Sequence, residues 1–390
     1  MAQGSAATGG IGMHAVRRRA AAALAGLVLV ALMVFAWSLS AGALPVSIND
    51  LLTALTGTEG GMEADIIRNL RLPRAVAAFA CGGLLALAGA LMQVLLRNPL
   101  ADPYVLGISG GAAVGALGAI LAGAASGWID AGAFVGALGA TLLVFGLAHG
   151  DGSWTQTRLL LTGVIVAAGC GAAVALMLSL APEGRVKGML FWLMGDASGA
   201  TRPWPALALL AVGLAAALPF ARELNLLTRG EVTARALGVR VGRLRGLVYG
   251  LGSLLTAAAV TTVGSVGFIG LIVPHLVRLA IGNDQRLLLP AATLAGGVLL
   301  CAADTAARTA VAPIQLPVGV LTALIGVPVF LNGKKRYPLE CRIRMRFENG
   351  KPTFGFIMQQ KEVVAADAFA EAREEIKNGT NLPLFAGRPE

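Results

Sequence analysis

Charged residues are scarce in this chain of 390 residues. Lys, Arg, Asp and Glu make up 13% of it, whereas a soluble globular domain carries roughly 25%. Hydrophobic residues reach 56%, and the mean hydropathy is +0.75. Since so few polar side chains could not cover a globule of this size in water, the composition excludes an ordinary soluble protein and predicts a membrane protein.

Nucleotide and metal motifs are also absent. No G-x-x-x-x-G-K-[ST] loop occurs in the chain, so nothing in the sequence predicts an ATP site. The glycine-rich run at residues 107–111 opens an apolar helix instead of following a strand, which excludes a phosphate-binding loop. His275 has no second His or Cys beside it, and we interpret it as structural. We predict no cofactor and no metal site, and we interpret as packing residues the four cysteines, which share no ligand spacing: Cys81, Cys170, Cys301 and Cys341.

Aromatic residues make up only 5% of the chain, which bears on the meaning of its net charge of +10. A basic balance can indicate nucleic-acid binding, but nucleic-acid sites combine basic patches with aromatic side chains. Here the basic residues are spread over many short loops, as is typical of the cytoplasmic loops of membrane proteins. The charge therefore predicts membrane topology and no nucleic-acid partner.

Long uncharged runs are what the sequence has in abundance. No charge lies between Arg74 and Arg97, and a helix of that length crosses a bilayer core of ~30 Å at 1.5 Å per residue. The pattern predicts an all-α polytopic bundle in a lipid bilayer, with a permease domain over residues 20–333. We expect about ten spans of ~20 residues, near residues 20–38, 75–96, 107–123, 131–148, 159–180, 204–220, 246–277 (two spans joined by a tight turn at 264–270), 287–305 and 318–331.

The chain contains 52 glycines, and small residues let membrane helices approach closely. Spacings of the small-xxx-small kind occur at Gly111/Gly115, Gly132/Gly136 and Gly246/Gly250. Glycine this frequent also produces such spacings by chance. Each pair is therefore a candidate helix contact.

We predict that residues 1–19 form a disordered cytoplasmic segment before the first span. A cleaved signal peptide is the alternative, because residues 41–43 resemble a cleavage site, but the uncharged run is longer than the usual 7–15 residues of such peptides. With the N-terminus inside and an even number of spans, both termini are cytoplasmic. All the basic segments then face the cytoplasm: Arg17–Arg19, Arg97, Arg158, residues 222–245, Arg278, Arg286 and Lys334–Arg336.

Five ordered motifs resemble the permease subunits of type II ABC importers, the FecCD-like permeases for ferric siderophores, haem and cobalamin. They are RLPR at 71–74, RNPLADPYVLGISGG at 97–111, GEVTARALGV at 230–239, GFIGLIVPHLVRL at 267–279 and LPVGVLTALIGVPVF at 316–330. The resemblance covers about residues 20–331 and implies the fold of those permeases. It also implies a bacterial inner-membrane subunit that pairs with a second copy, is no enzyme itself, and works with two ATPase subunits and a periplasmic or lipid-anchored substrate-binding protein. A ferric siderophore is the first choice of cargo, with haem or cobalamin next.

Residues 222–245 form the largest charged insertion in the hydrophobic body. An acidic residue near the start and a glycine at the end predict a short surface helix over residues 230–238. The resemblance implies that this helix docks in a cleft of the ATPase. An ordinary charged loop that only sets topology is the alternative. The residues that we assign to ATPase coupling are Gly230, Glu231, Ala234, Arg235, Leu237 and Gly238.

In similar permeases, arginines at the positions of Arg71, Arg74 and Arg308 receive acidic side chains from the binding protein. The residues themselves offer another interpretation, because Arg308 lies four residues after Asp304 and the two could form a simple helix pair. In the docking interpretation, Asp304 keeps Arg308 oriented. The resemblance also points to Gln156 and Thr157 as a cytoplasmic gate.

Residues 334–390 lie beyond the resemblance and form a C-terminal cytoplasmic extension of unassigned role. Alternating residues on both sides of Asn349-Gly350 predict a β-hairpin with a type I′ turn. Residues 362–377 are typical of an amphipathic helix. We therefore predict a small α+β tail.

Two other functional classes remain open. A secondary transporter driven by an ion gradient would need ionisable groups at mid-membrane, and only Asp196 and Asp304 come near that requirement. A membrane-embedded enzyme is weaker, because no His, Asp and Glu cluster falls at a common depth.

Overall fold

The computed structural model describes residues 6–42, 61–148, 156–200, 202–312, 314–334, 339–348 and 351–360, together with Val46, Leu51, Ala54 and Thr56. The chain divides into two compact units, Met1–Gly326 and Val327–Glu390, and each is described by itself. Seven helices among the described residues are long and apolar enough to cross a membrane, and three shorter apolar helices accompany them. Ten separate crossings remain a prediction.

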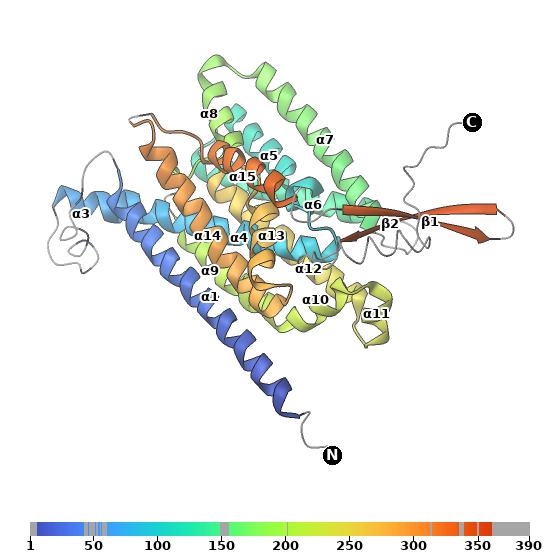
Figure 1. Cartoon of the computed structure of the whole chain (residues 1–390). Helices are drawn as coiled ribbons and strands as arrows, with labels where there is room; N and C mark the ends of the chain where they lie inside the picture. Colours follow the sequence, from blue (N-terminus) through green and yellow to red (C-terminus); the bar gives the residue numbers. More distant parts are fainter. Residues whose placement is uncertain are drawn as a thin grey trace, which may run out of the picture. The chain divides into compact units, whose positions relative to one another are not determined.

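The first unit consists of helices (Figure 1). In chain order they are α1 (Ala6–Ser40), α3 (Met62–Ile66), η1 (Ile67–Arg71), α4 (Leu72–Leu95), η2 (Pro103–Leu106), α5 (Ile108–Ala122), α6 (Ser126–Ala148), α7 (Gln156–Leu180), α8 (Glu183–Met194), α9 (Trp204–Ala217), η4 (Leu218–Phe220), α10 (Ala221–Thr228), α11 (Glu231–Ala236), α12 (Val241–Val263), α13 (Ile269–Ile281), α14 (Gln285–Thr309) and α15, which begins at Val318 and continues to Lys334.

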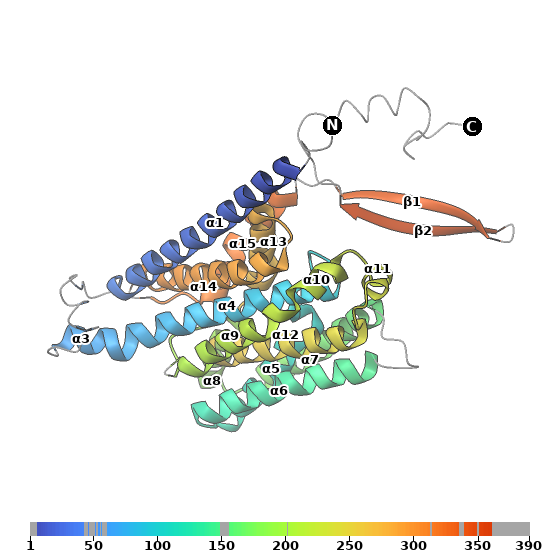
Figure 2. The same ribbon diagram turned by 90° about the horizontal axis from the view of Figure 1, so that it is seen from below.

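Helix α4 is the centre of this unit. It packs against α9, α12, α13 and α14, and Figure 2 shows it in the middle of the helices. Glycines bring its neighbours into backbone contact. A Cβ atom at Gly89 would lie 1.9 Å from the carbonyl oxygen of Gly270 in α13, and one at Gly82 would lie 2.2 Å from that of Gly296 in α14. Close backbone approach supplies the packing that lipid cannot supply by the hydrophobic effect.

The predicted glycine contacts are real in two of the three pairs. A Cβ at Gly111 would lie 2.4 Å from the oxygen of Gly136, and one at Gly115 would lie 2.0 Å from that of Gly132. The two motifs therefore pack against each other and join α5 to α6. At Gly246 and Gly250, an added Cβ would meet nothing within 4 Å, so that third pair makes no close contact with the part of the chain that the structure describes.

The helix that contains α4 begins earlier than the sequence suggested. Residues 62–71 are helical, although we expected the span to begin near residue 75, because Ala64 and Ile67 become buried. The turn Ile67–Arg71 is a π-helix just before Pro73. A proline ring collides with the carbonyl four residues earlier in a regular α-helix, and the wider π turn relieves that crowding.

Helix α1 also begins earlier than predicted. It starts at Ala6, so the segment of residues 1–19 that we expected to be disordered is helical from that residue onward. The physical reason is that an existing helix extends by one hydrogen bond per residue, and Ala, Met and Arg favour helix strongly.

The long apolar stretch from residue 246 to 277 divides as predicted. Helix α12 ends at Val263, α13 begins at Ile269, and the turn between them has positive φ at Gly264 (72°) and Phe268 (70°). Protein groups satisfy the non-helical backbone: Val266 N–H donates to the Tyr104 hydroxyl over 2.9 Å. Such pairing is what irregular backbone at membrane depth requires.

The connector between α4 and α5 is held by Asp102, which is buried and accepts a hydrogen bond from the N–H of Tyr104 over 2.8 Å. Burial raises the pKa of Asp102 to about 6, and the hydrogen bond from Tyr104 opposes that shift. A carboxyl at this capping position begins the short helix η2.

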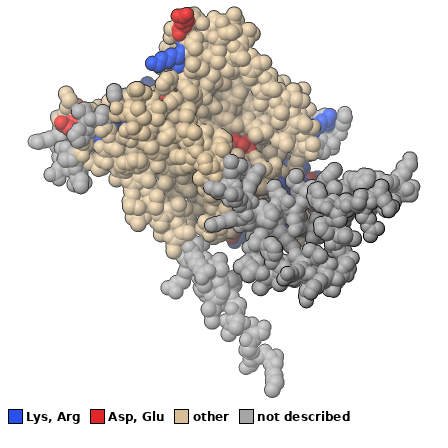
Figure 3. Space-filling view, turned by 45° about the horizontal axis from the view of Figure 1, so that its top comes forward, with Lys and Arg blue, Asp and Glu red and all other residues tan. Residues whose placement is uncertain are grey.

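The surface of the described residues is mostly uncharged. On the face shown in Figure 3, few Lys, Arg, Asp or Glu residues interrupt the other residue types. Large exposed hydrophobic side chains line α6 and α7, including Leu142, Leu147, Leu161 and Ile165. This is the surface expected of a protein whose solvent is lipid.

The second unit contains an antiparallel hairpin of β1 (Leu339–Glu348) and β2 (Lys351–Gln360). Leu339 pairs with Gln360 and Glu348 with Lys351, so two residues connect the strands, as the Asn349-Gly350 signal predicted. The helix predicted over residues 362–377 lies outside the described residues. The α+β tail as a whole therefore stays a prediction.

Candidate functional sites at the two ends of the helical unit

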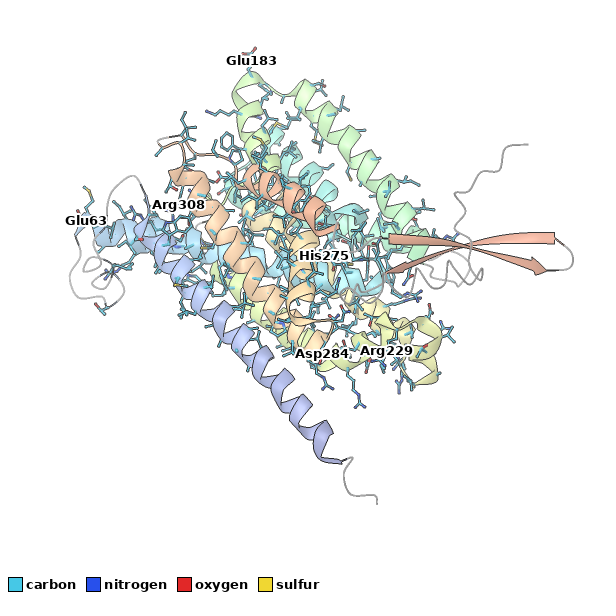
Figure 4. All side chains as sticks on the ribbon, in the orientation of Figure 1. Glu63, Glu183, Arg229, His275, Asp284 and Arg308 are labelled. Atoms are coloured by element: carbon cyan, nitrogen blue, oxygen red, sulfur yellow. The ribbon has the colours of Figure 1, made fainter. Side chains whose placement is uncertain are left out.

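Ionisable side chains of the first unit gather toward opposite ends. Figure 4 shows Arg308 toward the end that also carries Glu63, whereas Arg229 and Asp284 lie toward the opposite end. We call the first group the arginine cluster (Arg71, Arg74, Arg308 and Asp304). The second group, the elbow, comprises α10, α11 and the beginning of α12.

The arginine cluster is organised around Asp304 of α14, which is only 1% exposed. Arg74 of α4 approaches it with two parallel hydrogen bonds, Nε to Oδ2 and Nη2 to Oδ1, both of 2.9 Å. Its Nη1 also donates to Oε1 of Gln315 over 3.1 Å. A bidentate arginine–carboxylate pair fixes direction as well as distance, so α4 and α14 are held in register at this end.

The other two arginines cap the end of α1. Arg71 donates through Nη1 to the carbonyl oxygens of Leu39 (2.9 Å) and Ser40 (2.8 Å). Arg308 donates to the carbonyl oxygen of Ala41 over 2.8 Å, and also to the carbonyl oxygen of Ser38. The last carbonyls of a helix lack partners within it and carry partial negative charge. The two arginines satisfy both needs.

The structure therefore revises how Asp304 acts. We expected it to orient Arg308, but the distance from Oδ2 to Nε of Arg308 is 3.9 Å, longer than its contacts with Arg74. Arg74 is the main partner of Asp304 because two of its guanidinium nitrogens donate to the two carboxylate oxygens. Among the described residues, Asp304 is the carboxylate that forms ion pairs with both Arg74 and Arg308. Exposure is small for all three arginines: 6% for Arg71, and 13% and 10% for the side chains of Arg74 and Arg308.

The elbow is a helical excursion between α9 and α12. Its short helix α11 lies between two glycines with positive φ, Gly230 at 121° and Gly238 at 85°. A side chain would strain both backbones, so the glycines at both ends of the GEVTARALGV motif have a structural reason. Ala234 is the buried residue of α11 and faces the protein.

The charged residues of the elbow meet at Glu231. Its Oε1 accepts a hydrogen bond from Arg235 Nη2 over 2.6 Å, and its Oε2 accepts one from Arg245 Nη2, also over 2.6 Å. Arg235 is 66% exposed, so this pair within one helix is worth ~0.2–1 kcal/mol. Arg245 is 8% exposed and lies in α12. One carboxylate thus joins a surface arginine to a buried one.

The sequence did not single out two residues of the elbow, Val232 and Arg245. Val232 is 83% exposed and lies on the same short helix as Arg235, close to the 60%-exposed Leu237. The available signal for Val232 was its position in a charged motif. A large apolar residue in a short charged segment has no hydrophobic core to pack against, so it indicates an exposed contact surface. Arg245 was missed because nothing in sequence separates a buried arginine from the other arginines of residues 222–245.

The two residues assigned to a gate lie at the start of α7. Gln156 donates through Nε2 to the carbonyl oxygen of Leu95 (2.8 Å) and accepts through Oε1 from Arg97 Nη2 (3.2 Å). Thr157 is exposed. Arg97 also approaches the elbow, because its Nη1 lies 4.0 Å from the place of a Cβ at Gly230. The end of α4 therefore contacts both the candidate gate and the elbow.

Among the described residues, no three His, Cys, Asp or Glu side chains come together as a metal site would require. The three cysteines within that part of the chain, Cys81, Cys170 and Cys301, are free thiols. The ionisable side chains instead form the contacts just described, which suit the binding of protein partners more than chemistry on a substrate.

Comparison with known proteins places this geometry in a family. The family model described as the FecCD transport family matches residues 27–332. A second model, described as an uncharacterized conserved protein (DUF2303), matches residues 309–389, which include the tail.

Several curated relatives are similar over most of their length. A cobalamin import system permease protein of Halobacterium salinarum is 42% identical over 273 residues, 68% of this chain and 72% of that protein. A hemin transport system permease protein of Yersinia pestis is 41% identical over 320 residues, covering 78% and 93% of the two chains. A vitamin B12 import system permease protein of Klebsiella pneumoniae is 38% identical over 325 residues, covering 82% and 95%.

A solved structure is similar as well. It is a metal-chelate type ABC transporter in an inward-facing conformation, with a TM-score of 0.71, 31% sequence identity, and coverage of 80% of this chain and 98% of that one. The family match, the curated relatives and this structure agree with the five motifs. The chain belongs to the FecCD transport family, the permease subunits of type II ABC importers.

Proposed function

We propose that this chain is the membrane-spanning subunit of an ATP-driven importer. In this proposal a substrate-binding protein docks on the arginine cluster from outside, and an ATPase docks on the elbow from inside. The observation that carries the proposal is the placement of the two charged groups toward opposite ends of an apolar helical unit (Figure 4). Two different macromolecular partners on the two sides of a membrane would need such an arrangement.

The elbow has the features of a docking surface for a protein. Exposed Val232 and Leu237 flank the exposed cation of Arg235. Apolar residues that are fully exposed on the aqueous side of a membrane protein mark a contact with a partner. Because this chain has no nucleotide-binding motif, the energy for uphill transport would come from an ATPase bound at this surface.

The arginine cluster suits an acidic partner. Among the described residues, its Arg74 and Arg308 share the one carboxylate of Asp304. The guanidinium groups gathered at this end would attract carboxylates of a binding protein and orient its approach. Arg74 is the most exposed of the three, so we assign it the leading part in docking, with Arg71 and Arg308 behind it.

We further propose that two copies of the chain form the transport pathway between them. Helix α7 supports this, because only 11% of its most apolar stretch is buried within the chain. A second copy and lipid would cover such a helix. The gate at Gln156 and Thr157 lies at the end of α7 near the elbow, where movement of α11 would reach it through Arg97. ATP binding and hydrolysis would then alternate access between the two sides.

The topology of the proposal has ten crossings of a bacterial inner membrane, with both termini in the cytoplasm. The seven long and three shorter apolar helices of the described residues support this number. Residues 222–245, with six arginines, would lie inside, in agreement with the positive-inside rule.

A ferric siderophore is the proposed cargo, with haem or cobalamin next. The support is that relatives named for cobalamin, hemin and metal chelates share this fold and its motifs. All three are bulky chelates, and the apolar walls of such a pathway suit passage without tight binding. The structure of the described residues does not favour one of them.

The experiment is reconstitution of the chain in liposomes with the ATPase and binding protein that copurify with it. Uptake of a radiolabelled ferric siderophore, haemin and cyanocobalamin is measured with and without ATP. We expect uptake of one probe, and only with ATP and both partners. Uphill transport by the chain alone under an ion gradient would contradict the proposal and favour a secondary transporter. The contacts of Asp304 with Arg74 and of Asp196 with Ser198 give that alternative no support.

A further inference from the structure

Arg245 is buried, whereas the other five arginines of residues 222–245 are exposed. It is the fifth residue of α12, and its side chain is 8% exposed, compared with 66% for Arg235. A guanidinium removed from water needs a counter-charge with good geometry. Glu231, the first residue of α11, supplies it.

The geometry of this pair fixes the position of α11 on α12. Nη2 of Arg245 donates to Oε2 of Glu231 over 2.6 Å, and Nη1 donates to Oε1 over 3.3 Å. Because two nitrogens of a planar fork meet two oxygens, rotation of either side chain breaks the arrangement. The contact is therefore directional and rigid.

Helix α11 is short, and its other packing within this unit is against α10. It is six residues long, and Gly230 and Gly238, at its two ends, have φ values of 121° and 85° that bulky residues avoid. Ala234 is its one buried residue. A short helix between two glycines could rotate when a bound ATPase pushes on it, and the contact of Glu231 with Arg245 opposes that rotation.

Helix α12 can pass a displacement onward. It packs against α4, α5, α6 and α9 along its length. Its close contact with α4 includes Gly252, where an added Cβ would lie 2.6 Å from the terminal methyl group of Met92. Packed interiors of this kind move as rigid elements.

We propose that Arg245 is a positioning residue that transmits movement of α11 to α12 when an ATPase acts on the elbow. This inference rests on the proposed function. The Glu231–Arg245 fork makes α12 follow α11, so that ATP hydrolysis moves the membrane helices. Without the fork, α11 turns on its two glycines and hydrolysis proceeds without transport.

The test compares Arg245→Gln with Arg286→Gln in the full chain, reconstituted with its ATPase and binding protein. Arg286 is an exposed arginine of α14, outside the elbow, and serves as the matched control. The readout is the number of ATP molecules hydrolysed per molecule imported, using whichever of the three radiolabelled probes the wild type takes up. We expect this ratio to rise roughly tenfold for Arg245→Gln, and to stay at the wild-type value for Arg286→Gln.

A purely structural role would lower uptake and hydrolysis together and leave the ratio unchanged, and that result would overturn the inference. Equal ratios for the two variants would overturn it too. If Arg245→Gln does not reach the membrane, the same ratio is measured for Arg245→Lys. Lysine keeps the positive charge but cannot make the two-nitrogen contact with the carboxylate of Glu231. A raised ratio for Arg245→Lys supports the inference, and a wild-type ratio refutes it. Failure of the proposed function appears separately, as absence of ATP-dependent uptake by the wild type.

Discussion

The arginine cluster and the elbow use the same ion-pair chemistry in opposite ways. In the arginine cluster, a carboxylate that is 1% exposed lies among three largely buried arginines, two of which donate to backbone carbonyls. In the elbow, the carboxylate of Glu231 is 24% exposed and shared between a buried and a surface arginine. The first arrangement resists movement, whereas the second joins a rigid helix to a short one bounded by glycines. The comparison indicates that the burial of the ion pair, more than the kinds of residue present, determines whether the site resists movement or transmits it.

The largest effect is expected from Arg235→Glu in the elbow. It places a carboxylate four residues after Glu231, where like charges repel, and it reverses the charge offered to the ATPase. We expect ATP-dependent uptake to fall on the order of 100-fold, while the amount of protein in the membrane is unchanged. Arg286→Glu is the control, because it makes the same reversal at an exposed arginine of α14, outside the elbow. Normal uptake by Arg235→Glu would count against the elbow as the coupling surface.

Asp304→Ala should have the largest effect on stability in the arginine cluster. It leaves Arg74 and Arg308 buried without their carboxylate, and breaking a buried pair costs about 3–5 kcal/mol. Thermal unfolding of the purified chain in detergent measures the loss. Asp65→Ala removes an exposed carboxylate from α3 and should change stability by less than about 0.5 kcal/mol. Equal melting temperatures for the two variants would show that the ion pairs of Asp304 do not stabilise the fold.

Arg74→Gln should weaken the docking of the binding protein, and it should also lower stability because it leaves the buried carboxylate of Asp304 without its bidentate partner. Among the three arginines its side chain is the most exposed, and it makes no hydrogen bond to α1 in the described structure. We expect about a tenfold increase in the binding-protein concentration that half-maximally stimulates the ATPase, with a weaker dependence on salt.

Arg71→Gln tests the same order of the arginines in docking, because Arg71 is the least exposed of the three. Since Arg71 caps α1, its replacement should lower thermal stability more than it lowers docking. An effect of Arg71→Gln on docking larger than that of Arg74→Gln would reverse the order that exposure predicts.

The smallest effect is expected from Leu237→Ser. Leu237 is 60% exposed in the elbow, and loss of one peripheral apolar contact costs about 1 kcal/mol, or roughly fivefold in affinity for the ATPase. Copurification at graded ATPase concentrations measures it. Met62→Ser makes a similar change at an exposed residue of α3, at the end of the unit that carries the arginine cluster. It should leave the affinity for the ATPase unchanged.

Much of this fold follows from short-range pattern. Charge-free runs located the long helices, because that signal depends on residues close in sequence. Paired glycines marked candidate contact residues in α5 and α6, and the structure shows that these two helices meet each other there. The turn between α12 and α13 was predictable for the same reason, since one span cannot hold so many uncharged residues. The family motifs located the elbow.

Contacts between distant residues were not predictable. Arg74 and Asp304 are 230 residues apart, and the sequence favoured Arg308 as the partner only because it is four residues away. Likewise, burial distinguishes Arg245 from Arg235, and burial depends on how α12 packs against other helices. The extension of α1 to Ala6 was missed because helix continuation was weighed less than polar composition.

The caps on α1 have a consequence for biogenesis. The carbonyl groups at the end of the first helix are satisfied by Arg71, which lies 32 residues after Leu39, and by Arg308, which lies 267 residues after Ala41. Until α14 is synthesised, Arg74 lacks the carboxylate of Asp304, its bidentate partner. Completion of the arginine cluster therefore joins the first helix to α14, and a chain truncated before Asp304 would lack both the cap from Arg308 and the partner of Arg74.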